Sequence, residues 1–314
     1  MSWEKKTRCL WLLDKLKREN TLTLEEYECL TSVKALELIY YAAEHAGEVR
    51  KEVYGNEVYI SGLIRISNRC GNDCFYCGIR RSNKNCERYF LPREQILACC
   101  AKGYVLGLRT FVLQGGVGTI TADTICDIIS DIHRIYPDCA IMLSLGEHIR
   151  SEYEQMYFAG ANHYSLYHMT ADREHYERLH PGEMSFHNRM DCLRDLKDIG
   201  FRIGCGFMVG SPHQTPHTLA KELKFIEEFQ PEMASANGGS MNFCYHKLAS
   251  HLGQPKHDWE LPYVTRTYDN VFKNTFQDME YCIRTMNRCG TLPEYEVFDY
   301  GQLSNLAYFQ KEGI

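Results

Sequence analysis

The pattern of hydrophobic and polar positions switches between two periods along most of this chain. Short apolar runs, typical of buried strands, occur seven times, and longer stretches with apolar residues at helical spacing separate them. Strands and helices that alternate at this spacing form βα units with parallel pairing, so the pattern predicts an α/β fold. The predicted strands are Val58–Ile66, Thr110–Leu113, Ala140–Leu145, His163–Tyr167, Arg202–Met208, Met233–Ala236 and Tyr295–Phe298.

Helical patterns are predicted between the strands and at both ends of the chain. Thr23 and Glu26 precede an apolar run with the spacing of a capping box, so a helix should begin there. Residues 1–20 have the pattern of an amphipathic helix, another helix should run to about Gly55, and the chain should end in a helix after the seventh strand. Between the strands, we expect helices at Arg93–Lys102, Thr121–Tyr136, Glu152–Ala159, Phe186–Ile199, Thr215–Phe229 and Tyr268–Cys289, and a loop at Ser250–Leu261.

Length and composition exclude several classes of protein. A chain of 314 residues can form one barrel or two small domains. Its net charge of -6 and the lack of a basic block give little support for nucleic-acid binding, and the lack of a run of 18 apolar residues argues against a membrane span. Without a secretory signal, the 15 cysteines are interpreted as reduced thiols of a cytoplasmic protein rather than as disulfides.

Three cysteines, Cys70, Cys74 and Cys77, stand as C-x3-C-x2-C in "NRCGNDCFYCG", directly after the first predicted strand. Three thiolates this close can hold three irons of a [4Fe–4S] cluster, which leaves the fourth iron open to a ligand such as the amino and carboxylate groups of S-adenosylmethionine. A structural zinc site or three unrelated buried thiols are the alternatives. Zinc sites usually have four ligands in two pairs, and no second C-x2-C occurs in this chain.

The stretch from about Thr21 to Glu228 resembles the radical S-adenosylmethionine (SAM) maturase of [FeFe]-hydrogenase, within the biotin synthase and methylornithine synthase group. The carrying segments are "SGLIRISNRCGNDCFYCGIRRSN", "TFVLQGG", "IMLSLGEHIR", "RLHPGEMSFHNRMDCLRDLKDIGFRIGCGFMVG" and "HQT". The resemblance implies a TIM-like βα barrel, either complete or incomplete, with a [4Fe–4S] cluster on the three cysteines. It also implies that SAM yields a 5′-deoxyadenosyl radical that acts on a small polar substrate, with an electron donor such as ferredoxin or flavodoxin.

The same resemblance assigns further residues to the cofactor, at the C-terminal ends of the strands where barrel enzymes place their chemistry. Arg189 is expected to pair with the cofactor carboxylate, which a guanidinium binds in bidentate fashion. The other expected cofactor contacts are Tyr76, Gln114, Gly115, Gly116, Ser144 and Glu147.

Four positions depart from the family pattern. Val117 stands where an acidic residue is usual, His213 stands where the family has Gly, and Tyr167 and Met169 replace an Arg-x-Glu pair. Met169 cannot accept hydrogen bonds from ribose hydroxyls as a carboxylate does. Either the substrate differs from that of the family, or the protein is a non-catalytic, degraded or chimeric iron–sulfur protein.

Beyond about Gln230 the sequence is similar to a different family, the β-keto acid cleavage enzymes, which are zinc-dependent barrels. Glu296 could match the late glutamate ligand of that family, but its H-x-H pair is missing from this chain. A metal-dependent lyase is therefore a further alternative function. We expect N-terminal helices over residues 1–55, a radical SAM core over 56–229 and a barrel-completing segment over 230–314. A natural fusion, a recombined gene and a designed chimera remain open.

Overall fold

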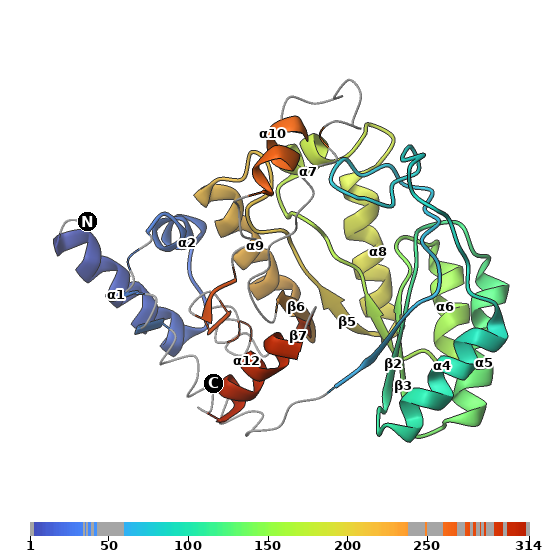
Figure 1. Cartoon of the computed structure of the whole chain (residues 1–314). Helices are drawn as coiled ribbons and strands as arrows, with labels where there is room; N and C mark the ends of the chain where they lie inside the picture. Colours follow the sequence, from blue (N-terminus) through green and yellow to red (C-terminus); the bar gives the residue numbers. More distant parts are fainter. Residues whose placement is uncertain are drawn as a thin grey trace. The chain divides into compact units, whose positions relative to one another are not determined.

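The structure is a computed structural model (Figure 1). Its chain divides into two compact units. Unit 1 comprises Met1–Glu57, Gly210–Gln230 and Ala234–Ile314, and unit 2 comprises Val58–Val209 and Pro231–Met233. The residues that the structure describes are 3–33, 35, 37–38, 41–42, 60–237, 249, 260–268, 274–276, 279–280, 283, 286, 292–297 and 300–311.

Unit 2 contains a parallel sheet in which five consecutive strands lie in chain order. Residues Arg65, Gln114 and Ser144 are register partners at the C-terminal ends of the first three strands, so these ends form one edge of the sheet. The strands are β1 (Gly62–Arg65), β2 (Thr110–Gln114), β3 (Ala140–Ser144), β4 (His163–Ser165) and β5 (Arg202–Cys205).

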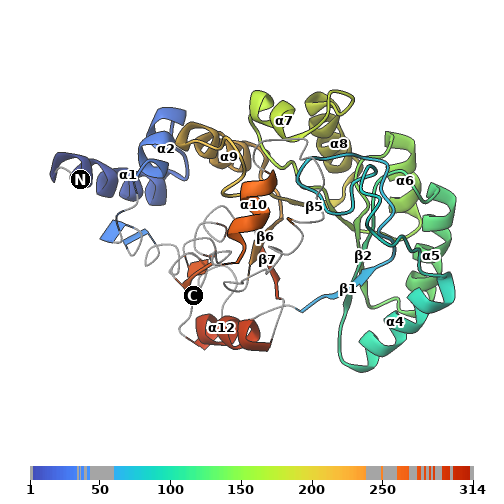
Figure 2. The same ribbon diagram turned by 45° about the horizontal axis from the view of Figure 1, so that its top comes forward.

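The central strands of this sheet are buried on both faces. Three consecutive residues are buried in β2 (Phe111 to Leu113) and again in β3 (Ile141 to Leu143), as expected for parallel strands with both faces covered. Helices α4, α5, α6 and α8 lie along the outer side of these strands in Figures 1 and 2. The helices of unit 2 are α4 (Arg93–Val105), α5 (Ala122–Ile135), α6 (Arg150–Phe158), α7 (Arg173–Leu179) and α8 (Phe186–Ile199).

Local sequence explains where these helices begin. Thr121 and Ser185 cap α5 and α8, each with its side-chain oxygen accepting a hydrogen bond from a backbone N–H of the first turn. In α5, isoleucines at helical spacing (residues 125, 128, 129 and 132) form the buried stripe that packs on the sheet.

Unit 1 is built around α1 (Trp3–Glu19), α2 (Leu24–Thr31) and α9 (Pro216–Phe229). The predicted capping box is present, because Thr23 and Glu26 exchange side-chain to backbone hydrogen bonds. Glu227 of α9 accepts hydrogen bonds from Thr21, the Leu22 N–H and the Tyr27 hydroxyl, which ties α9 to the start of α2.

The remaining described elements are β6 (Met233–Asn237), α10 (Glu260–Arg266), β7 (Leu292–Glu296) and α12 (Tyr300–Lys311).

The element pattern agrees with the sequence in most places. Each of the seven predicted strands overlaps a strand of the structure. Two helices were not predicted: α7 and α10, the latter beginning at Glu260 inside the expected loop. Most of the helix expected before Gly55, and most of Tyr268–Cys289, lie outside the described residues.

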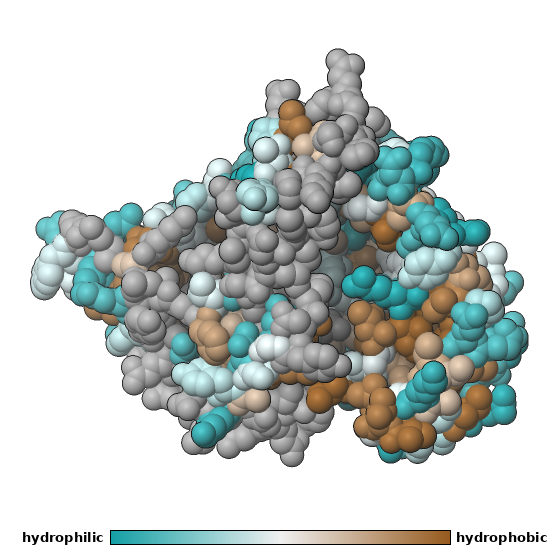
Figure 3. Space-filling model, viewed as in Figure 1, coloured by the Kyte–Doolittle hydropathy of each residue, from teal (hydrophilic) through white to brown (hydrophobic). Residues whose placement is uncertain are grey.

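The surface of the described residues carries both hydrophilic and hydrophobic side chains. In Figure 3 hydrophobic residues gather at the lower right, over the region of α4, where Val105 and Leu106 are exposed. No helix in the described part of the chain is long and apolar enough to cross a bilayer.

Candidate functional site

The three cysteines lie on a long connection between β1 and α4, residues 66–92, which we call the cysteine loop. Arg88 holds this loop together from within. Its guanidinium donates hydrogen bonds to four backbone carbonyls, those of Asn68 (2.6 Å), Ile79 (2.8 Å), Arg80 (2.7 Å) and Asn83 (3.0 Å). A rigid planar donor that bonds to both halves of a loop fixes its path.

The ends of the cysteine loop are also fixed. Ser67 and Phe90 form an antiparallel bridge, and the Asn68 side chain donates to the Glu87 carbonyl at 2.6 Å and accepts from the Tyr89 N–H at 2.8 Å. The loop is therefore closed at its base, and the segment with the three thiols forms its middle.

The three thiols are partly buried and act on one another electrostatically. Burial raises the pKa of the Cys74 thiol to about 11, hydrogen bonding with Tyr76 opposes this rise, and Cys77 and Cys70 add to it. Burial also raises the pKa of Cys77, opposed by the Ile79 backbone and by the charges of Arg80 and Arg88. Iron ligation would need to displace the thiol protons, because thiolates are the ligands.

Among the described residues, no group of three or more His, Cys, Asp or Glu side chains surrounds a point where a single ion would sit. A single zinc would require its ligands at about 2.0–2.3 Å from one point. An iron–sulfur cluster instead distributes its thiolates over separate irons, so the cysteine sulfurs need not converge on one point. The spacing of the three cysteines thus remains compatible with a cluster.

The glycines after β2 pack directly against the cysteine loop. A Cβ on Gly116 would overlap the Arg69 carbonyl oxygen and lie 2.7 Å from the Cys70 Cβ. The Gly71 N–H donates to the Val117 carbonyl at 2.7 Å, and the Thr119 hydroxyl donates to the Arg69 carbonyl at 3.1 Å. In this structure the absence of a side chain at Gly116 is what permits close packing beside the first cysteine.

Glu147 connects the cysteine loop to the first turn of α8. Its carboxylate accepts from the Asn72 amide at 3.0 Å and from Arg189 Nε at 2.9 Å, while Arg189 also donates to the Tyr167 carbonyl at 2.8 Å. Both charged side chains are largely buried, with exposed fractions of 14% and 6%. Burial opposes the charge of Arg189, but Glu147 and the nearby phenols of Tyr176 and Tyr76 outweigh it and raise the Arg189 pKa.

Tyr76 is the first member of a hydrogen-bonded chain that leads away from Cys74. His180 Nδ1 lies 2.8 Å from the Tyr176 carbonyl, which can only accept, so Nδ1 carries the proton. The Nε2 atom of His180 then accepts from the Tyr76 hydroxyl at 3.0 Å. Burial lowers the pKa of His180 to about 4, which agrees with a neutral ring in this position.

Met169 lies beyond β4, which ends at Ser165. It forms a single parallel bridge with Phe207 and has a left-handed backbone with φ of 67°. The expected extension of the fourth strand to Tyr167 is therefore interrupted. Burial nevertheless alternates along this segment, because His168 is buried while Tyr167 and Met169 are half-buried.

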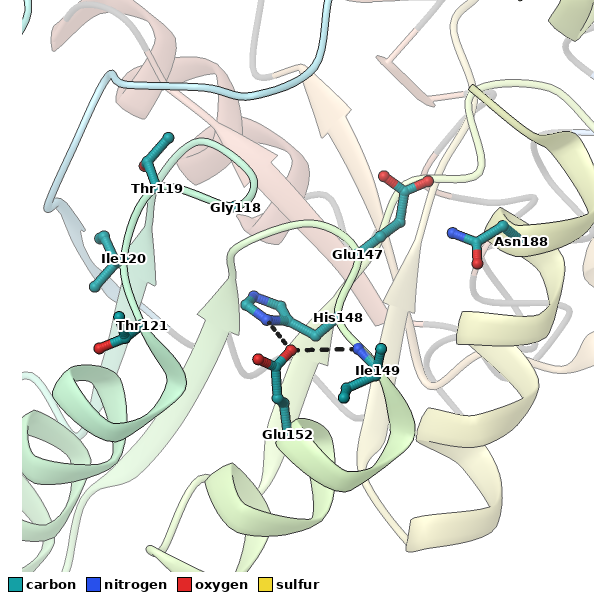
Figure 4. Close-up of a pocket in the computed structure, with 9 residues that line it drawn as sticks. All are labelled: Gly118, Thr119, Ile120, Thr121, Glu147, His148, Ile149, Glu152 and Asn188. Atoms are coloured by element: carbon teal, nitrogen blue, oxygen red, sulfur yellow. Dashed lines mark hydrogen bonds and ion pairs between the residues drawn. The ribbon is translucent and has the colours of Figure 1, made fainter. Parts of the chain in front are cut away.

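A cleft of about 520 Å³ lies beside Glu147, at the C-terminal ends of β2 and β3 (Figure 4). His148 Nδ1 lies 3.0 Å from the Glu152 carboxylate, which also accepts the Ile149 N–H and thereby caps α6. The cleft is lined by Gly118, Thr119, Ile120, Thr121, Glu147, His148, Ile149, Glu152 and Asn188.

The structure thus places the predicted site residues on one edge of unit 2. Tyr76 interacts with both Cys74 and Arg189, and Arg189 donates to Glu147. Gly116 packs on Cys70. Gln114 and Ser144 end neighbouring strands in register, and the Gly115 N–H donates to the Ser144 carbonyl. Sequence reasoning missed Asn72, Arg88 and His180. Asn72 and Arg88 lie within the cysteine loop, but nothing in the spacing of the residues indicates their partners.

Comparison with known proteins gives relatives of two kinds. Residues 115–314 match the model of the beta-keto acid cleavage enzyme family. The chain is 40% identical over 189 residues to the [FeFe] hydrogenase maturase subunit HydE of Thermotoga maritima, which covers 60% of this chain and 53% of HydE. It is 43% identical over 105 residues to a 3,5-dioxohexanoate:acetyl-CoA acetone transferase of Paraburkholderia graminis, 33% of each chain.

Among solved structures, methylornithine synthase (PylB) is similar over 90% of this chain and 85% of its own, with a TM-score of 0.66 and 20% identity. At this identity the likeness shows the fold, and the expected TIM-like α/β fold is confirmed. The chain spans about half the length of HydE and a third of the transferase.

Proposed function

Although the chain belongs to the beta-keto acid cleavage enzyme family through residues 115–314, we propose that its site is that of a radical SAM enzyme. The observation that carries the proposal is the cysteine loop, whose thiols act on one another electrostatically and whose Asn72 donates to Glu147 of the Glu147–Arg189 pair. The 40% identity with HydE over 60% of the chain supports the same function.

The donor set of the loop fits a [4Fe–4S] cluster. The three thiols stand on one loop whose path Arg88 fixes, and the positive charges of Arg80 and Arg88 oppose the rise that burial causes in the Cys77 pKa. Gly116 leaves space for the Arg69 backbone and the Cys70 Cβ to lie against the end of β2. When bound, the cluster would reduce SAM by one electron and so give a 5′-deoxyadenosyl radical.

The protein residues would bind and orient the cofactor. Arg189 presents a fixed positive charge at the edge of the sheet, where it would attract the carboxylate of SAM. Glu147 holds that guanidinium in place, and the Tyr76–His180 contact fixes the aromatic ring next to the third cysteine. The substrate would be a small polar molecule, and we propose that residues 56–229 carry the chemistry while 230–314 complete the barrel.

Anaerobic reconstitution tests this proposal. The parent protein should bind about four irons per chain and should form 5′-deoxyadenosine from SAM when reduced. A variant with Cys70, Cys74 and Cys77 all changed to Ala should lose both the iron and the product. As a matched control, the Cys99→Ala/Cys126→Ala variant removes two thiols from the helices α4 and α5 and should keep both. Equal iron in the triple variant and the parent would show that the cysteine loop is not the site.

A metal-dependent lyase is the second candidate, favoured by the match of residues 115–314 to the beta-keto acid cleavage enzymes. Glu296, at the end of β7, would be one ligand, but the sequence contains no H-x-H pair to supply the others. Zinc analysis of protein purified without added metal separates the two functions. One tightly bound zinc per chain that survives the triple Cys→Ala change, with cleavage of a 3-keto acid, would favour the lyase.

A further inference from the structure

The cleft beside Glu147 contains a hydrogen-bonded pair that has no role in the proposed function. His148 and Glu152 both line this cleft (Figure 4), and His148 Nδ1 lies 3.0 Å from the Glu152 carboxylate. An ionised carboxylate can only accept, so Nδ1 carries the proton, and Nε2 of the neutral ring is an acceptor. The other edge of the ring therefore offers a lone pair and no proton.

This lone pair has no partner in the described part of the chain. The His148 side chain is only 6% exposed, and its Nε2 atom is buried without a hydrogen bond to any described residue. Buried polar atoms are nearly always satisfied, because one without a partner costs free energy. In Figure 4 the ring lies between the start of α5 and Glu152, with Nε2 on the side of Gly118 and Thr119. A ligand that donates an N–H or O–H from the cleft would supply the missing bond.

Glu152 adds a second acceptor and a negative charge. Its bonds with His148 and with the Ile149 N–H both use Oε2, and Oε1 accepts no hydrogen bond from the described residues. The Glu152 side chain is 34% exposed, so its carboxylate can be approached from solvent. The other carboxylate of the cleft, Glu147, is balanced by Arg189. No Lys or Arg is among the residues that line the cleft, so the charge of Glu152 is left over.

An anion and a metal ion fit this cleft less well. The Glu152 carboxylate already caps the N-terminal end of α6, where an anion would otherwise be attracted. A metal site would need at least three protein ligands, and the described residues contain no such group of His, Cys, Asp and Glu. A cationic hydrogen-bond donor satisfies both the lone pair of His148 and the charge of Glu152.

The cleft also offers apolar surface. Ile120 and Ile149 lie on opposite sides of the His148 ring in Figure 4, and Ile149 is 66% exposed. The volume of about 520 Å³ is that of a site for a small molecule.

We propose that this cleft binds a small aliphatic amine. Its ammonium group donates to His148 Nε2 and Glu152 Oε1, and its alkyl chain lies against Ile120 and Ile149. An ammonium has three donors and a positive charge, so it can bond to both acceptors and neutralise the carboxylate. This ligand site goes beyond the proposed function and uses none of the three thiols.

The test is a nuclear magnetic resonance titration of the full-length chain with isotope-labelled histidine rings, at about pH 8, where an ordinary imidazole is neutral and an alkylamine is charged. The probes are butylamine, 1-butanol and butanoate, which share a four-carbon chain and differ in charge. The ring signal that disappears in His148→Leu belongs to His148, and its shift on adding a probe reports binding in the cleft.

Two substitutions on α6 separate the site from general attraction of cations to an acidic protein. Glu152→Gln removes the charge of the pair and keeps the cap of α6, because Gln serves at this position of a capping box as Glu does. Glu154→Gln is the matched control, since Glu154 lies on the same helix, pairs with Arg150 and does not line the cleft. Unchanged signals from the other histidines show that each variant is folded.

We expect butylamine to shift the His148 signal and to bind about tenfold more tightly than 1-butanol, because its hydrogen bonds are charge-assisted. Butanoate should leave the signal unchanged. In Glu152→Gln the affinity for butylamine should fall by about tenfold, to the level of 1-butanol, whereas Glu154→Gln should match the parent.

Equal affinity for butylamine and 1-butanol would overturn the inference, and so would butylamine binding that Glu152→Gln leaves unchanged. A shift of the His148 signal by butanoate at lower concentration than by butylamine would assign the cleft to an anion instead and would also overturn it. A His148 signal that none of the probes shifts would leave Nε2 to water and would rule out the amine site.

Discussion

Gly116 shows at the scale of one residue how the sheet edge and the cysteine loop fit together. We predict that Gly116→Ala loses most of its bound iron after reconstitution and is less stable by about 1–3 kcal/mol, the usual cost of overpacking. The physical reason is that the new methyl group would overlap the Arg69 carbonyl and approach the Cys70 Cβ to 2.7 Å. Iron analysis and urea unfolding measure the two effects.

The matched control for this change lies in the same loop. Gly78 directly follows Cys77, and a Cβ on Gly78 would have no atom within 4 Å. Gly78→Ala should therefore keep the iron and the stability of the parent. Equal loss of iron in both variants would mean that the loop tolerates no change at all, and that close packing at Gly116 is not the cause.

His180 makes the stability of the protein depend on pH. Its pKa is lowered from 6.5 to about 4 by burial, so the unfolded chain binds a proton between these values while the folded protein does not. Stability is therefore complete above pH 6.5 and is lost as the pH falls toward 4, by an amount on the order of 3 kcal/mol for this group. In urea unfolding, the free energy of unfolding of His180→Gln should change less between pH 6.5 and 4 than that of the parent.

His133, which is exposed on α5, gives the control substitution for this measurement. The His133→Gln variant should follow the parent curve, since it leaves His180 and its contacts with Tyr76 and Tyr176 in place. If His180→Gln loses stability between pH 6.5 and 4 as steeply as the parent, another group causes the loss.

The sequence alone indicates only some of the residues that form the candidate site. The C-x3-C-x2-C spacing marks the three thiols as candidate ligands because it places them on one short stretch of chain. Arg88 has no such signal, since its four acceptors are backbone carbonyls that exist only once the loop has folded. The link from Asn72 through Glu147 to Arg189 likewise joins residues 75 and 42 positions apart.

At the scale of elements, the Glu147–Arg189 pair joins the end of β3 to α8, and Asn72 joins both to the cysteine loop. We predict that Glu147→Ala destabilises the protein by about 3–5 kcal/mol, because it leaves the Arg189 charge buried without its partner. Arg189→Met should cost less, since Glu147 keeps the Asn72 amide and lies closer to solvent.

A double-mutant cycle tests whether the two residues act as a pair. The Glu147→Ala/Arg189→Met variant should be more stable than the sum of the single changes predicts, with a coupling of about 1–3 kcal/mol. Strictly additive effects, measured by urea unfolding, would show that the pair does not hold α8 to β3. An exposed ion pair of the same helix, Arg194–Asp191, should give a coupling of less than about 1 kcal/mol in the same measurement.

Element boundaries were predicted best where the apolar residues repeat over several turns or along a whole strand. The stripe of isoleucines made α5 easy to predict, while α7, with seven residues after the Asp172 cap, was too short to show a period. The fourth strand was predicted to reach Tyr167 but ends at Ser165. Beyond Ser165 the pairing is reduced to a single bridge between Met169 and Phe207. Met169 has a left-handed backbone there, and a conformation of this kind leaves no mark in the pattern of apolar residues.

At the scale of the whole molecule, the described site belongs to one of the two units. The cysteine loop, the edge of β2 and β3, and the first turn of α8 all lie within Val58–Val209. A ligand that binds only the folded form stabilises the part that binds it. Loading the cluster should therefore slow amide hydrogen exchange in unit 2, most of all in the cysteine loop and at the ends of β2 and β3.

Hydrogen-exchange mass spectrometry of the apo and loaded protein measures this effect. Peptides from the cysteine loop should exchange at least tenfold more slowly after loading, which corresponds to a gain of about 1.4 kcal/mol in local opening free energy. Peptides from α2 and α9 of unit 1 should be unchanged, because Glu227, the residue that joins them, has its described hydrogen bonds inside unit 1. The triple Cys→Ala variant, treated with the same iron, should show no change in either unit. An equal slowing in α2 and α9 would contradict the prediction and would show that the chain responds to the cluster as a single cooperative body.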